Sequence, residues 1–117
     1  MKNAFMLPAM LAMLAMLALL WAAPGALAQQ ADAKAGQAAY TKSCVSCHAA
    51  DGSPKEAIAK MMKVEMRHLG AKEVQAKTDS ELRKDTLEGV GKMKAVKNLT
   101  DRQVVDLIAF VRTLAAK

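Results

Sequence analysis

Both cysteines of this 117-residue chain fall within one five-residue stretch that ends in a histidine. The stretch is Cys44-Val45-Ser46-Cys47-His48, and its C-x-x-C-H pattern is typical of the attachment site for a c-type haem. Two thiols with this spacing lie on one turn of the chain, so each can add to a vinyl group of the same porphyrin. The imidazole that follows would be held beneath the iron as its first axial ligand. The sequence therefore predicts one covalent haem c, attached through Cys44 and Cys47 and ligated by His48.

The same residues admit two other interpretations, and both are weaker. A closed structural zinc site needs four ligands, but the only other histidine is His68, so a carboxylate would have to complete the set. A redox-active dithiol of the thioredoxin type is expected within a βαβ pattern. The residues after His48 show no strand alternation. Haem attachment is therefore the interpretation that we favour.

The first 28 residues have the pattern of an export signal. Lys2 supplies a short positive region, an apolar run extends from Ala4 to about Ala23, and Ala26-Leu27-Ala28 matches the A-x-A pattern of a cleavage site. We therefore expect residues 1–28 to be a cleaved signal peptide and residues 29–117 to be a single domain exported to the periplasm. The alternative is an uncleaved membrane anchor, because about 20 apolar residues suffice to cross a bilayer.

The composition of the predicted domain indicates a small core. Removal of Lys2 with the leader lowers the formal net charge from +6 to +5, and it leaves Tyr40 and Phe110 as the only aromatic residues. So modest a charge and so few aromatic rings argue against binding to nucleic acid. Domains of this size often depend on a bound cofactor for stability. We therefore expect a buried porphyrin to supply apolar mass and the haem-free chain to be largely unfolded.

Capping residues predict an all-α domain of three to five helices. Asp32 is suited to cap the first helix, and the pairs Thr78/Glu81 and Thr100/Gln103 each match a capping box. The expected helices cover residues 32–43, residues 55–69 with Gly70 as the stop, residues 78–89, and the chain from residue 100 onward.

The first and last helices are expected to pack against each other. Gly36, Tyr40 and Cys44 recur every four residues and therefore share one face of the first helix. Glycine inside a helix costs about 1 kcal/mol relative to alanine, so Gly36 indicates a close approach by another helix. The last helix offers one apolar stripe, made of Val104, Leu107, Ile108, Val111 and Leu114.

Haem iron has a second axial position, and what fills it separates electron transfer from open-site chemistry. Met93 is the favoured ligand because it lies in an expected loop, residues 89–94, where two glycines let the backbone bend. Three other methionines recur at helical spacing, which is typical of flexible packing around a pocket. His68 is expected at the surface. The alternative ligands are therefore His68, Met61, Met62 and Met66, and an open site is also considered.

The chain resembles the small bacterial class I cytochromes c along nearly the whole length of the predicted domain. The resemblance is carried by Gly36-x-x-x-Tyr40-x-x-x-Cys44-x-x-Cys47-His48, by Gly91-Lys92-Met93, and by the stretches Leu99–Gln103 and Phe110–Leu114. It implies an all-α fold wrapped around one covalent haem, with the N- and C-terminal helices crossed near Gly36 and Phe110. It also implies that Met93 is the distal ligand and that the protein carries single electrons and is not an enzyme.

Two positions differ from what the resemblance leads us to expect. Lys94 stands where many relatives have a proline directly after the ligand methionine. Pro54 is the only proline near the C-x-x-C-H motif whose carbonyl could accept a hydrogen bond from the imidazole of His48. Such a bond would orient the ring and raise its basicity.

The predicted function is that of a soluble, monomeric one-electron carrier between periplasmic or membrane-bound redox proteins. A positive rim around an exposed haem edge would steer an acidic partner. The alternative interpretation of the lysines is a scatter of solvated charges. The functional alternatives are a haem enzyme or gas sensor with a labile distal site, and a cytochrome subunit of a larger respiratory complex. The lysines that would form the rim are three beside Met93 and two in the second expected helix: Lys92, Lys94, Lys97, Lys60 and Lys63.

Overall fold

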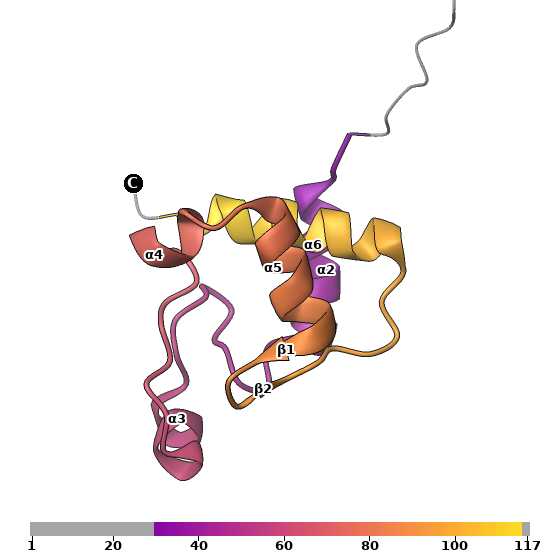
Figure 1. The fold of residues 1–117 in the computed structure, drawn as a ribbon. Coiled ribbons are helices and arrows are strands. Elements are labelled where there is room, and N and C mark those ends of the chain that lie inside the picture. The colour runs from indigo at the N-terminus through magenta and orange to yellow at the C-terminus, as the bar shows by residue number, and fades with distance from the viewer. Residues whose placement is uncertain (1–29, 116–117) are drawn as a thin grey trace, which may run out of the picture. The chain divides into compact units, whose positions relative to one another are not determined.

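Helices make up most of residues 30–115, the part of the chain that this computed structural model describes (Figure 1). The expected all-α fold is confirmed, and a very small hairpin is added to it. The signal peptide expected over residues 1–28 lies outside the described residues. Along the chain, the elements are α2 (Ala33–Ser43), α3 (Glu56–Met62), α4 (Lys72–Gln75), α5 (Asp79–Glu88), β1 (Gly89–Val90), β2 (Met93–Lys94) and α6 (Asp101–Thr113).

The expected helix starts are confirmed at three of the elements. Asp32 caps α2, and its side chain accepts hydrogen bonds from two amides of the first turn. Thr78 and Glu81 form both bonds of a capping box at α5, and Thr100 and Gln103 form the same pair of bonds at α6. Each cap satisfies amides that have no partner inside the helix.

The helix expected over residues 55–69 is wrong in length. It begins one residue later than expected and ends at Met62, because Lys63 adopts a left-handed conformation with φ 52° and ψ 53°. The chain then returns without regular secondary structure, and the amide of Leu69 donates to the carbonyl of Gly52 at 2.8 Å. Pairing with this distant loop overrides local helix propensity. The four-residue helix α4 follows and was not predicted.

Residues 89–94 form a hairpin and not the irregular loop that was expected. Gly89 pairs with Lys94, and Val90 pairs with Met93, in antiparallel register. Gly89 has a φ of 84°, and a Cβ added there would lie 2.5 Å from the carbonyl oxygen of Met93. Gly91 also has a positive φ, of 55°, in the turn. The two glycines follow the end of α5, and their positive φ angles let the chain turn and pair as two strands.

The core is built on the crossing of α2 and α6, as expected. A Cβ added to Gly36 would lie 1.8 Å from the backbone oxygen of Asp106, so the two helices touch through their backbones. Tyr40 packs beside this contact with its ring centroid 5.1 Å from that of Phe110, and Leu107 completes the cluster. A second cluster, made of Leu82, Val104 and Ile108, seats α5 on α6.

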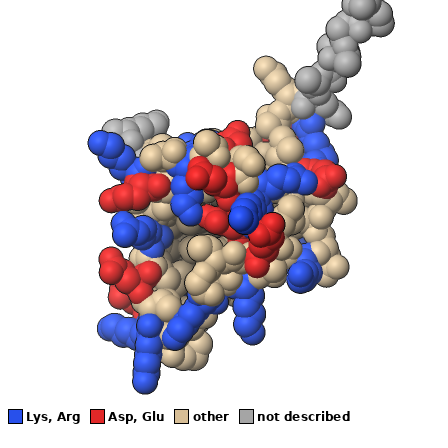
Figure 2. Space-filling model, in the orientation of Figure 1, with Lys and Arg blue, Asp and Glu red and all other residues tan. Residues whose placement is uncertain are grey.

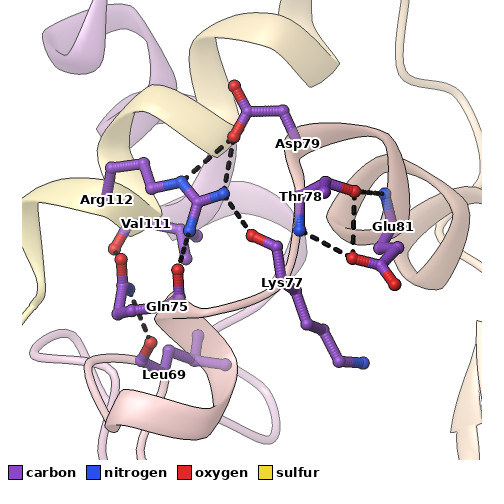
Figure 3. Close-up of polar contacts among 8 residues, drawn as sticks. All are labelled: Leu69, Gln75, Lys77, Thr78, Asp79, Glu81, Val111 and Arg112. Carbon is purple, nitrogen blue, oxygen red and sulfur yellow. Dashed lines mark hydrogen bonds and ion pairs between the residues drawn. The ribbon is translucent and has the colours of Figure 1, made fainter.

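Polar contacts fasten the segment that joins α4 to α5 onto α6 (Figure 3). The guanidinium of Arg112 donates to the carbonyl of Gln75 at 2.8 Å and to the carboxylate of Asp79 at 2.7 Å. The side-chain amide of Gln75 donates in turn to the carbonyls of Leu69 and Val111, at 2.9 and 3.0 Å. The return from α3 is thereby held against the last helix.

The substitution Gly36→Ala is expected to destabilise the holoprotein, although alanine is the better helix former by about 1 kcal/mol. Overpacking typically costs about 1–3 kcal/mol, and here the clash is with backbone atoms of α6 that cannot rotate away. Denaturant unfolding measures the net effect. Gln37→Ala, at an exposed position of the same helix, is the matched control and should change the free energy of unfolding little. A Gly36→Ala variant as stable as the parent would contradict the close approach.

Candidate haem-attachment site

The C-x-x-C-H stretch forms a tight turn where α2 ends. Cys44 is the C-cap of α2, and its amide donates to the carbonyl of Tyr40 at 2.8 Å. The carbonyl of Cys44 accepts from the amides of Cys47 and His48 at 3.2 and 3.0 Å, so one turn of backbone gathers all three candidate residues. Both cysteines are half-buried and their thiols are free. The turn therefore presents the two sulfurs and the imidazole together, as attachment to one porphyrin requires.

Burial sets the protonation of these groups. Desolvation, with a smaller effect from the neighbouring Cys47, raises the pKa of the Cys44 thiol to about 11. Burial also lowers the pKa of His48. At neutral pH His48 is therefore an uncharged imidazole, which is the form that binds metals.

The polypeptide alone leaves the imidazole of His48 unsatisfied. Its Nδ1 atom is buried and has no hydrogen-bond partner among residues 30–115. His48 and Pro54 face each other in an antiparallel bridge, flanked by a 2.8 Å bond from the amide of Ala49 to the carbonyl of Ser53. The bond expected from this ring to the carbonyl of Pro54 is thus not formed here. Buried polar groups nearly always have partners, so an orphaned ring nitrogen fits an imidazole built to serve a bound group.

Tyr40 supports this turn in a way that sequence reasoning missed. Its hydroxyl donates to the carbonyl of Ala49, the residue after His48, at 2.6 Å. Burial of the Tyr40 side chain raises its pKa to about 12, so the hydroxyl keeps its proton. The sequence showed only that Tyr40 shares a helix face with Cys44. That shared face was the available signal, since it places the ring directly beneath the motif.

The side of the fold around α3 lacks a core of its own. None of the residues of α3 or α4 is buried, and Met61 is 71 % exposed. A cavity of about 430 Å³ opens along α3, from Pro54 beside His48 to Met66 beyond the helix end. In Figure 1, α3 stands away from the other helices at the end of two long connections. The cavity lining is half apolar and half charged, and the exposed Met61 is a side chain that a bound porphyrin could cover.

Met93 lies on β2, half-buried and paired with Val90, in the hairpin that follows α5. Met93 and His48 belong to different segments, the hairpin after α5 and the turn after α2. The hairpin is nevertheless well fixed at its base, because β1 continues directly from α5. The assignment of Met93 as an iron ligand therefore stays a prediction.

The other candidate ligands take up different positions. Met66 is outside α3, contrary to the expected helical position, and it lines the cavity there. His68 is exposed, as expected, and its Nδ1 accepts from the amide of Gly70 at 2.8 Å. It borders a second cavity of about 470 Å³ together with Asp51 and Leu114.

Within residues 30–115, the His, Cys, Asp and Glu side chains form no group of three or more that could hold a metal ion. In that same part of the chain, no helix has the length and apolar character needed to cross a membrane.

A family model, described as Cytochrome c, matches residues 33–115 of the chain. The protein belongs to the cytochrome c family. No curated protein matches the chain. Membership shows that the protein carries a covalently bound c-type haem and works in electron transport, and Cys44 and Cys47 are placed as that attachment requires.

Removal of the haem is expected to unfold most of the domain, because α3 has no buried side chain without it and the remaining core is small. Circular dichroism of the double variant Cys44→Ala/Cys47→Ala, prepared without haem, measures this against the intact holoprotein. We expect a large loss of helical signal and no cooperative thermal transition. A native-like spectrum with a cooperative melt would show that the polypeptide folds alone.

Proposed function

We propose that the protein is an exported, soluble one-electron carrier whose haem iron is ligated by His48 and Met93. The observation that carries the proposal is the hairpin around Met93, where two glycines with positive φ present a thioether from a fixed base. A methionine and a histidine together give iron a raised reduction potential and no open site for substrate. The bound haem supplies the one-electron couple, and the protein residues hold and bury it.

The proposed roles of the residues follow from where they lie. Cys44 and Cys47 hold the porphyrin covalently at the end of α2, so the group cannot dissociate. His48 would bind the iron as a neutral imidazole, from a turn that Tyr40 holds by a partly buried hydrogen bond. Because hydrogen bonds hold the turn of His48 and strand pairing holds the base of the hairpin, little has to rearrange when an electron moves.

The site of action that we propose is outside the cytoplasm. Support comes from the sequence of residues 1–28, with its apolar run and A-x-A pattern. Cleavage there would release the domain of residues 29–117. N-terminal sequencing of the exported protein, expected to begin at Gln29, determines whether the leader is removed or kept as an anchor.

The partners that we propose are redox proteins with an acidic docking surface. Lys94 and Lys97 are exposed next to Met93, and the contact of Lys92 with the end of α3 brings Lys60 and Lys63 to the same region. In Figure 2, basic side chains project along the lower edge of the view, where Figure 1 places α3 and the hairpin. Positive charge around the mouth of a redox site raises the rate of encounter with an acidic partner at low salt.

The ligand assignment is tested by Met93→Ala, with Met66→Ala as the matched control. The unaltered ferric protein is expected to show the weak red absorption band that marks methionine coordination, and its reduced form should resist carbon monoxide. Met93→Ala should lose the band, bind carbon monoxide and have a lower reduction potential, because the thioether no longer ligates the iron. Met66→Ala should retain the band.

Two results would assign the site differently. Persistence of the band in Met93→Ala would give the ligand role to another methionine. An unaltered protein that lacks the band and binds carbon monoxide freely would instead indicate a haem enzyme or gas sensor.

The docking surface is tested by the double charge reversal Lys94→Glu/Lys97→Glu. We expect slower electron exchange with an acidic redox protein, and a weaker dependence of the rate on ionic strength, because steering charge is lost. Stopped-flow kinetics over a salt series gives both quantities. Lys34→Glu/Lys42→Glu, on exposed positions of α2, changes the net charge equally and is the control. Equal slowing by both double variants would mean that net charge, and not this surface, matters.

A further inference from the structure

The turn that precedes Met93 is tied to a distant helix by a lysine side chain. The Nζ atom of Lys92 donates to the carbonyl oxygen of Met62 at 2.7 Å, a contact between residues 30 positions apart in the sequence. Met62 is the last residue of α3. The contact therefore joins the tip of the hairpin to the helix that borders the cavity between Pro54 and Met66.

The end of α3 is prepared to accept such a donor. The last carbonyls of any helix lack partners within it. Because Lys63 turns left-handed, its amide folds back on the carbonyls of Ala59 and Lys60, and the amide of Val64 also returns to Ala59. The carbonyl of Met62 is left for another donor. An ammonium group is favourable there, since the bond is charge-assisted and the C-terminal end of a helix attracts cations.

Met93 lies between two anchors that differ in kind. The base of the hairpin is fixed by strand pairing and by a 2.8 Å bond from the amide of Val96 to the carbonyl of Thr86 in α5. The tip is fixed through Lys92. Lys94, directly after Met93, does not restrict the backbone as a proline at that position would. Loss of the Lys92 contact would therefore free the tip while the base stays in place.

We propose that Lys92 is a positioning residue that holds the Met93 hairpin against α3 and so keeps the thioether at the iron. This inference rests on the proposed ligation by Met93. It separates Lys92 from its neighbours Lys94 and Lys97, which have no such acceptor among residues 30–115. All three lysines are exposed, but Lys92 alone of the three donates a hydrogen bond to another segment of residues 30–115.

The inference is tested with the holoproteins of Lys92→Ala, Lys92→Arg and Lys94→Ala. Lys94→Ala is the matched control because it removes one positive charge from the residue on the other side of Met93. Added imidazole, which competes with the thioether for ferric iron, is the probe, and loss of the methionine–iron band reports its binding. Lys92→Ala should bind imidazole about tenfold more tightly, the effect expected for one lost hydrogen bond of this kind. Lys94→Ala should stay within about twofold of the parent, and Lys92→Arg should restore most of the difference.

The outcomes distinguish the positioning role of Lys92 from the ligation by Met93. If imidazole bound more tightly to Lys92→Ala and to Lys94→Ala by the same factor, the loss of one positive charge would explain the effect. That result would overturn the positioning role. Unchanged imidazole affinity in Lys92→Ala would overturn it as well. A parent protein that shows no methionine–iron band would overturn the ligation by Met93 first, and this inference with it. The folding equilibrium constant of Lys92→Ala should fall by no more than the same tenfold factor, because unfolding loses the same exposed contact.

Discussion

The backbone contact between α2 and α6 at Gly36 is the constraint on which the rest of the fold depends. Only a residue without a Cβ lets the two helices meet there, and their approach brings Tyr40 onto Phe110. Tyr40 then reaches the carbonyl of Ala49 from below, while Cys44 lies one helical turn further along the same face. The haem-attachment turn is thus held both by the hydrogen bond from Tyr40 and by the end of α2 at Cys44. Both depend on the helix contact at Gly36, twelve residues before His48.

The fold is complete on the side of this crossing and incomplete on the side of α3. Buried clusters lie on α6, where α2 and α5 pack, whereas α3 contributes no buried residue. A covalently bound porphyrin resolves this asymmetry, because its apolar surface can cover side chains that the polypeptide leaves open. In this part of the molecule the bound haem therefore takes the place of a hydrophobic core.

The parts of the fold that could be predicted from the sequence are those decided within a few residues. The caps at Asp32, Thr78 and Thr100 form as expected, because a side chain and the amides that it satisfies are neighbours in sequence. The prediction that a helix reaches Leu69 was wrong. The helix ends at the left-handed Lys63, and Leu69 pairs with Gly52. Neither feature can be recognised from the neighbouring sequence. The same limit applies to the site. Its motif is local and was found, whereas the bonds of Tyr40 and Lys92 join segments that only folding brings together.

The positions of the two proposed iron ligands are fixed in different ways. His48 follows directly from covalent attachment and a tight turn, so its position is fixed by short-range geometry and by the end of α2. Met93 depends on strand pairs of two residues each and on one exposed side-chain contact to α3. Short ladders and exposed hydrogen bonds open most readily in folded proteins. The methionine side is therefore the more easily displaced, and substitutions around Lys92 can alter the properties of the iron without touching the attachment site.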